Sequence, residues 1–150
     1  MKKLLFITIL LISIKSHSQC LIPFDEFVKS TKFSLSEFDT FALNKGFSYN
    51  GNYQGYLCDT AYDFDGHSML ARVIKPNSII VSYDFISKTQ YLDYKTTLET
   101  KGKLVNQKNT STKLTMQYVY DNRVVLLETQ TITLPTNESH SFYDIIMSNN

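Results

Sequence analysis

Residues 113–132 read KLTMQYVYDNRVVLLETQTI, and this stretch decides the fold. Its first half alternates between apolar and polar residues, which is the period of a β-strand with one buried face. The apolar positions are Leu114, Met116, Tyr118 and Tyr120. Asp121 and Asn122 follow, and both tolerate the positive φ that the favoured two-residue hairpin turns need. The stretch therefore predicts an antiparallel hairpin, with a second strand over 124–132.

A similar pattern occurs 56 positions earlier in the chain. Residues 56–64 alternate in the same way, end in Asp65-Gly66 and precede a strand over 69–74. Later, Tyr83-Asp84 matches Tyr143-Asp144 at an offset of 60, since loop 134–140 inserts four residues. We infer a tandem duplication of a helix-plus-strands unit, over about 34–86 and 87–148. The alternative is that the two segments are similar by chance, because alternating aromatic residues are common in strands.

A helix is predicted at the start of each unit, over 35–45 and 88–101. Each has a Ser three residues before a Glu or Gln, which is a capping-box pattern, and each is followed by a glycine stop signal. These residues are Ser34, Glu37 and Gly46 in the first unit and Ser87, Gln90 and Gly102 in the second. The apolar stripes are Leu35, Phe38 and Ala42, and Tyr91, Tyr94 and Leu98. A shorter amphipathic helix is expected over 23–28.

Each main helix has one apolar stripe and can cover only one side of a sheet. We therefore expect an α+β fold, a single curved antiparallel sheet of six to eight strands with two main helices on one face. Further strands are predicted over 78–85 and 142–147, and the polar run 106–112 is interpreted as a loop. This arrangement is similar to that of secreted enzyme inhibitors such as the β-lactamase inhibitor proteins. The likeness is architectural and carries no residue across.

The first 18 residues are typical of a cleavable secretory signal peptide. Lys2 and Lys3 form a basic start, residues 4–14 are apolar, and Ser16-His17-Ser18 is a small-x-small cleavage site. A membrane anchor would need about 20 apolar residues. A lipoprotein signal acylated at Cys20 is a second alternative, although the residues before Cys20 do not match a lipobox. We expect a secreted or periplasmic bacterial protein whose residues 19–150 form one α+β domain.

Charge and motifs restrict the function. The chain has 15 Lys+Arg and 14 Asp+Glu, and removal of residues 1–18 takes away three lysines and leaves a formal charge of −2. The sequence has no basic stripe, so we expect neither nucleic acid nor anionic lipid as a partner. We also expect no cofactor, because no Gly-rich phosphate loop, Gly-x-Ser-x-Gly or His-Glu-x-x-His motif is present.

The two cysteines, Cys20 and Cys58, are predicted to form a disulfide. Export places them where disulfides persist, and in the chain-entropy model a bridge closing a loop of about 37 residues contributes roughly 3–4 kcal/mol. Two unpaired thiols are the alternative. We favour the bridge because an exposed free thiol is a liability in an oxidising compartment.

The leading functional hypothesis is a non-catalytic binding protein of the inhibitor, immunity or envelope accessory type. It would bind another exported or envelope protein through a sheet face. Candidate binding residues are Tyr56, Tyr62, Tyr118 and Tyr120, because rigid amphipathic rings make good contact surfaces. Core filling is the alternative for these tyrosines, since Tyr has a high strand propensity.

The second hypothesis is a small secreted hydrolase or lyase with an acidic site near Asp59, Asp63 and His67. The alternative is that these polar residues belong to a hairpin turn at Asp65-Gly66 and have no catalytic role. We expect no metal there, because Ala61 stands where a calcium loop needs an acidic residue.

The signal peptide is testable by N-terminal sequencing of the protein recovered from the exported fraction. Cleavage after the small-x-small site should give a chain that begins at Gln19 or Cys20. Soluble protein that retains Met1 would contradict the prediction.

Overall fold

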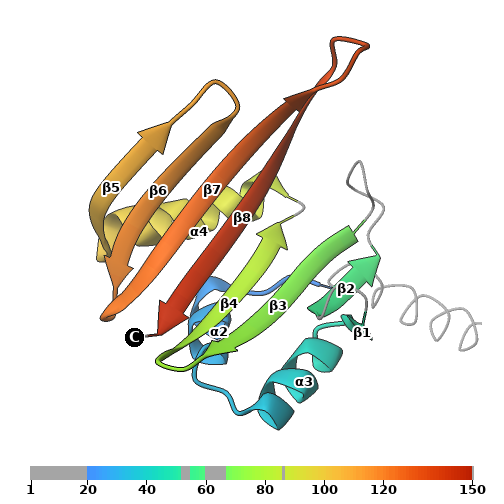
Figure 1. Ribbon diagram of the computed structural model, residues 1–150, viewed down its shortest axis with the longest axis vertical. Helices are drawn as coiled ribbons and strands as arrows, with labels where there is room; N and C mark the ends of the chain where they lie inside the picture. The colour runs from blue at the N-terminus through green and yellow to red at the C-terminus, as the bar shows by residue number, and fades with distance from the viewer. Residues whose placement is uncertain (1–19, 52–54, 60–66, 86, 150) are drawn as a thin grey trace, which may run out of the picture.

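The computed structural model describes residues 20–51, 55–59, 67–85 and 87–149, and the predicted signal peptide lies outside them. The helices are α2 (Phe24–Ser30), α3 (Leu35–Asn44) and α4 (Lys88–Lys101). The strands are β1 (Ser48–Asn50), β2 (Gly55–Asp59), β3 (His67–Lys75), β4 (Ser78–Phe85), β5 (Lys103–Asn109), β6 (Lys113–Tyr120), β7 (Arg123–Thr133) and β8 (Ser139–Asn149). They form one antiparallel sheet in the order β1-β2-β3-β4-β8-β7-β6-β5 (Figure 1).

The sheet consists of two four-stranded meanders that meet at their last strands. Helix α3 precedes β1 to β4, helix α4 precedes β5 to β8, and β4 pairs with β8 at the centre (Figure 1). The second half thus repeats the element order of the first, as the predicted duplication requires. Asp84 is the cross-strand partner of Asp144, and the sequence repeat had made these two residues equivalent. The β4–β8 pair therefore lies on the pseudo-two-fold axis that relates the halves.

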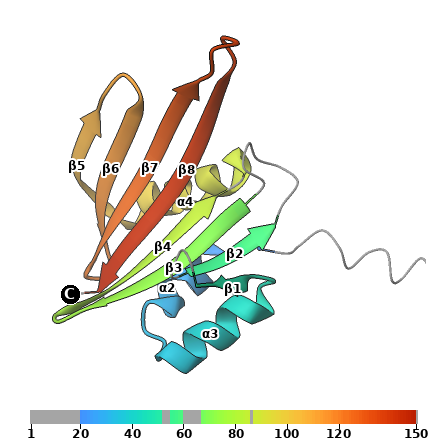
Figure 2. The same ribbon diagram turned by 45° about the vertical axis from the view of Figure 1, so that its right-hand side comes forward.

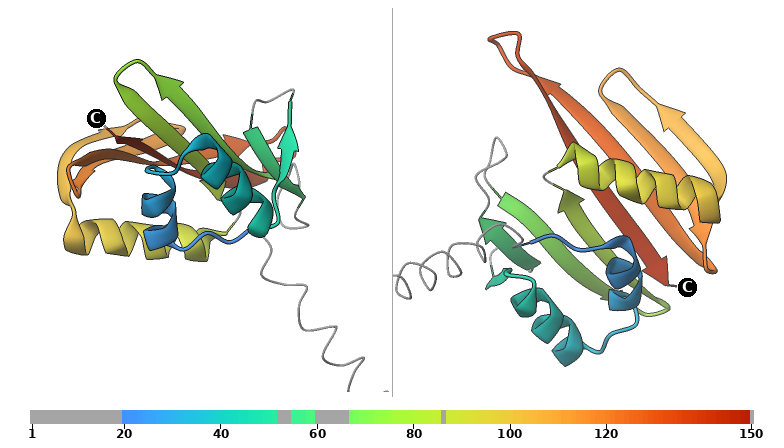
Figure 3. Two further views of the ribbon diagram at one scale, coloured as in Figure 1. Left: turned by 90° about the horizontal axis from the view of Figure 1, so that it is seen from below. Right: turned by 180° about the vertical axis from the view of Figure 1, so that it is seen from behind.

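The three helices pack on the same face of the sheet, as the views from below and from behind show (Figure 3). The core lies between these helices and the sheet, and alternate residues of the strands point into it. Central strands contribute Val81, Tyr83, Ile145, Met147, Val125 and Leu127, and the helices contribute Phe24, Phe27, Phe38, Tyr91, Tyr94 and Leu98. No described helix covers the opposite face, which we call the open face (Figure 2). The predicted fold class is confirmed.

The segment before α2 runs through the core. Cys20 and Ile22 are fully buried, and Cys20 forms a disulfide with Cys58 of β2 with a Cα–Cα distance of 6.1 Å. The hydroxyl of Tyr83 donates to the Cys20 carbonyl at 2.6 Å, and that of Tyr94 donates to the Ile22 carbonyl at 2.5 Å. Buried phenols are thus satisfied by the segment they pack against. The predicted disulfide is confirmed.

The helix caps follow the sequence prediction at α3 and only half of it at α4. The Ser34 side chain accepts from the Glu37 N–H at 3.3 Å, and the Ser34 N–H donates to the Glu37 carboxylate at 2.7 Å. At α4, Ser87 accepts from the Gln90 N–H at 3.1 Å. The Gln90 amide donates instead to the Ile22 carbonyl at 2.9 Å, because the chain before α2 lies within its reach.

The two stop glycines act for different reasons. Gly46 has a φ of 88°, the left-handed conformation that favours glycine after a helix. Gly102 is extended, but a Cβ there would lie 2.7 Å from the carbonyl oxygen of Leu98. The same residue type thus meets a conformational need in one unit and a steric need in the other.

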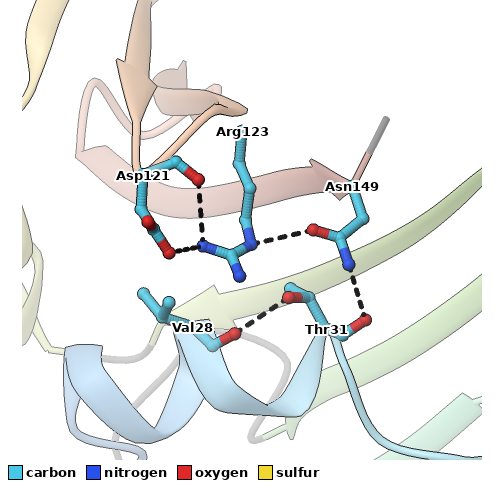
Figure 4. A network of polar contacts seen from close by, with 5 residues as sticks. All are labelled: Val28, Thr31, Asp121, Arg123 and Asn149. Carbon is cyan, nitrogen blue, oxygen red and sulfur yellow. Dashed lines mark hydrogen bonds and ion pairs between the residues drawn. The ribbon is translucent and has the colours of Figure 1, made fainter.

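A buried arginine links the β6–β7 turn to the end of α2 (Figure 4). Asp121 and Asn122 have φ values of 48° and 58°, so the predicted hairpin turn is confirmed. The Arg123 guanidinium bonds to the Asp121 carboxylate, lowering the pKa of that carboxyl, and donates through Nε to Asn149 Oδ1 at 2.8 Å. The Asn149 amide donates to the Thr31 carbonyl at 3.3 Å. Two distant parts of the chain are joined by these bonds.

Two local predictions were wrong. The run 106–112, interpreted as a loop, lies largely in β5, which spans Lys103–Asn109. This strand is at the sheet edge with every residue exposed, so a polar composition is compatible with it. Leu35, assigned to the apolar stripe of α3, is 61% exposed, because only Phe38 and Ala42 of that stripe reach the core.

Within the described ranges, no helix combines the length and the apolar character needed to cross a membrane.

Reduction of the disulfide should destabilise the fold strongly. The bridge joins residues 38 positions apart, so its loss should lower the free energy of unfolding by about 3–4 kcal/mol. Urea unfolding with and without dithiothreitol measures the difference. The Cys20→Ser/Cys58→Ser double variant is the control and should not respond to the reductant. Equal midpoints for the oxidised and reduced natural chain would contradict the prediction.

Candidate functional site

Three of the four tyrosines that the sequence proposed as a binding surface, Tyr56, Tyr118 and Tyr120, lie on the helix-covered face. Tyr118 is 1% exposed and Tyr56 is also buried. Tyr120 packs edge-on against Phe24, with 5.1 Å between the ring centroids. Tyr62 lies outside the described residues. The described rings therefore fill the interior, which is the alternative that the sequence had left open.

The acidic cluster of the second hypothesis is only partly described. Asp59 and His67 are cross-strand partners in β2 and β3, whereas Asp63 lies outside the described residues. In the part of the chain that is described, no group of three or more His, Cys, Asp or Glu side chains could hold a metal ion.

A row of three carboxyl groups crosses the centre of the open face. Asp84 of β4 is the cross-strand partner of Asp144 of β8, and Asp144 is the partner of Glu128 of β7. Their chain neighbours Tyr83 and Ile145 are buried beneath the helices. Because side chains alternate along a strand, the three carboxyl groups point the other way. We call Asp84, Asp144 and Glu128 the carboxylate row.

One end of the carboxylate row is neutralised within the protein. The Lys113 ammonium lies 2.7 Å from one carboxylate oxygen of Glu128, and the Thr115 hydroxyl donates to the other at 2.9 Å. Glu128 is buried with these two partners, as a charged side chain in such a place must be. Among the described residues, by contrast, neither Asp84 nor Asp144 takes part in an ion pair.

The aspartate pair shares a proton near neutral pH. Burial, followed by the charge and the hydrogen bond of Asp144, raises the pKa of Asp84 to about 7. Burial also raises the pKa of Asp144, although the hydrogen bond from Asp84 acts in the opposite direction. Directly opposed strand residues have Cβ atoms about 4.5–5.5 Å apart, where two ionised carboxylates repel strongly. A protonated Asp84 that donates to an ionised Asp144 satisfies both groups.

Aliphatic side chains flank the carboxylate row on the same face. Ile146 and Leu126 are cross-strand partners two positions from Asp144 and Glu128. Beyond them the register pairs Val73 with Ile80 and Val119 with Val124. Val73 and Val119 are exposed and the others are partly exposed. We call these residues the aliphatic band, comprising Val73, Ile80, Val119, Val124, Leu126 and Ile146.

Sequence reasoning missed the carboxylate row because its three members come from three strands far apart in the chain. The available signal was the match of Tyr83-Asp84 with Tyr143-Asp144. A residue at the last strand of each repeat meets its own copy if those strands pair on the pseudo-two-fold axis. That pairing is a property of the sheet order and cannot be read from either repeat alone.

Comparison with known proteins gives no relative from which a function can be transferred. No family model matches the chain, and neither a curated protein nor a solved structure does.

The Asp84→Asn variant should be more stable than the natural chain at pH 8. The pKa of Asp84 is higher in the folded state than in the unfolded state. The free energy of unfolding of the natural chain therefore falls as the pH rises from about 4, where the unfolded carboxyl ionises, to about 7. Asparagine donates to Asp144 without that penalty, so the gain should be on the order of 2–3 kcal/mol at pH 8 and vanish at pH 4. Urea unfolding at pH 4, 6 and 8 measures it.

The exposed loop variant Glu138→Gln is the matched control and should show no such pH-dependent gain. An Asp84→Asn protein that is less stable than the natural chain at pH 8, or equally stabilised at every pH, would contradict the shared proton.

Proposed function

We propose that this protein is an exported, non-catalytic binding protein of the inhibitor, immunity or envelope accessory type, which binds another protein through the open face. The observation that supports the proposal is the composition of that face. Asp84 and Asp144 face each other at its centre, and none of the described helices lies over the aliphatic band beside them.

The carboxylate row specifies the chemistry of the partner. Glu128 already has Lys113 and Thr115 as partners, whereas Asp84 and Asp144 face each other as like groups. An arginine or lysine side chain of a partner can take the place of the shared proton and form charge-assisted hydrogen bonds with both carboxylates. The partner is therefore expected to place a basic side chain at the centre of the contact.

The aliphatic band supplies the apolar part of such a contact. Burial of apolar surface contributes about 25 cal/mol per Å². Contacts around a charged anchor also exclude water from it, which strengthens its interactions. The band and the carboxylate row lie on paired strands of one sheet, so little order has to be gained on binding.

Enzyme activity is the second candidate. Two carboxyl groups that share a proton are also the arrangement of aspartic-protease dyads, so the Asp84–Asp144 pair offers an acid and a base at neutral pH. The earlier alternative, a hydrolase or lyase site near Asp59, Asp63 and His67, uses different residues. Substitutions on the aliphatic band separate binding from either catalytic site.

Capture of a partner from the envelope fraction by immobilised residues 19–150 tests the proposal. Ile146→Lys places a like charge beside the site of the partner's basic group and should reduce retention of a specific protein at least tenfold. Leu92→Lys, on the exposed side of α4, is the matched control and should retain it. Equal retention by both variants would contradict binding through the open face.

The pH dependence of capture provides an independent measurement. A cationic partner favours ionised carboxylates, so binding should release the shared proton and the affinity should rise as pH increases from 6 to 8. The Asp84→Asn/Asp144→Asn variant should bind weakly and lose this dependence. Retention that is unchanged in the double variant would exclude a basic anchor at the aspartate pair.

A further inference from the structure

A pocket lies on the helix side of the first meander, between α3 and strands β1 to β3. Its volume is about 430 Å³. Helix α3 contributes Leu35, Phe38, Asp39 and Leu43, and the strands contribute Tyr49, Tyr56 and Arg72. Leu35, Leu43 and Tyr49 are each more than half exposed, so the rim is apolar and open to solvent. This pocket and the open face lie on opposite sides of the sheet.

Arg72 in this pocket is incompletely paired. Its Nη2 donates to the Phe33 carbonyl at 2.6 Å, and the guanidinium lies over the Phe38 ring at 5.8 Å from the centroid. Its Nε and Nη1 are buried and have no hydrogen-bond partner in the described structure. Arg123, by contrast, uses both of the corresponding atoms, bonding through Nε to Asn149 and through Nη1 to Asp121. Buried donors without acceptors are unfavourable, so hydrogen bonds from Nε and Nη1 to a ligand with acceptor atoms would stabilise Arg72.

The one carboxylate among the pocket residues has a partner of its own. The Tyr56 hydroxyl donates to Asp39. Burial, and then this hydrogen bond, raise the pKa of Tyr56 to about 12, so the phenol stays neutral and holds Asp39. Asp39 thus leaves Nε and Nη1 of Arg72 unpaired. Its negative charge also lies in the same pocket, so a ligand with two negative charges is disfavoured.

We propose that this pocket binds an organic monocarboxylate with a short apolar tail. The carboxylate accepts hydrogen bonds from Arg72, and the tail packs against Leu35, Leu43 and Tyr49 at the rim. The two unpaired nitrogens are closed to solvent in the free protein, so the unbranched side chain of Arg72 has to rotate and present them to the pocket as the ligand enters. Mostly apolar walls with a few polar anchors are the usual composition of small-molecule sites.

Calorimetric titration of residues 19–150 with hexanoate, at constant ionic strength, tests the proposal. Hexanoate should bind with one-to-one stoichiometry, and the matched neutral probe hexanamide should bind at least tenfold more weakly. Arg72→Gln should reduce hexanoate affinity at least tenfold. Lys45→Gln removes a nearby cation that pairs with Glu26 at 2.5 Å outside the pocket, and should leave the affinity unchanged.

Asp39→Asn provides a second measurement if Arg72→Gln does not fold. Removal of the negative charge should raise the hexanoate affinity several-fold, since the asparagine oxygen can still accept from Tyr56. Hexanamide binding as tight as hexanoate binding, no saturable binding at millimolar ligand, or weaker binding by Asp39→Asn would each overturn the proposal. Asp84→Asn should not affect hexanoate binding, so this site and the open face are tested separately.

Discussion

The antiparallel pairing of β4 with β8 is the constraint on which the rest of the structure depends. Every other strand pair joins chain neighbours, whereas this one connects residues such as Tyr83 and Ile145 from different repeats. Without it, each meander would end in an unpaired strand with open hydrogen-bonding groups. The pairing also determines which residues of the two halves lie on the same face of the sheet, because side chains alternate along a strand. Placing Tyr83 under the helices places Asp84 on the open face.

The carboxylate row is a consequence of this symmetry. An aspartate in one isolated repeat would be an ordinary surface residue, but on the pseudo-two-fold axis Asp84 meets its copy, Asp144. Burial, followed by the charge and the hydrogen bond of Asp144, raises the pKa of Asp84 to about 7, so that Asp84 can stay protonated and donate to Asp144. Such departures from electrostatic compatibility concentrate at functional sites. Arg72 is a departure of the same kind on the other side of the sheet, because its buried Nε and Nη1 have no acceptors among the described residues.

Sequence patterns predicted the elements far better than the sites. Capping residues and apolar stripes located α3 and α4, and the Asp121-Asn122 pair located a hairpin turn, because these signals act within a few residues. The edge strand β5 was missed, since a strand in which every residue is exposed has no buried face and therefore no apolar alternation to detect. The burial of the tyrosines could not be predicted, because alternation assigns Tyr118 to one face of the sheet but does not show whether helices cover that face.

The sequence by itself determined the two main helices, the β6–β7 turn, the shared side of each strand's residues and the repeat of a helix-plus-strands unit. These features follow from local periodicity and backbone preferences. Only the tertiary structure decided that the helices cover the tyrosine side, that Asp84 lies opposite Asp144, and that Nε and Nη1 of Arg72 lack acceptors among the described residues. Each of these depends on strand order and packing between residues tens of positions apart, and local patterns contain no information about which distant groups will meet.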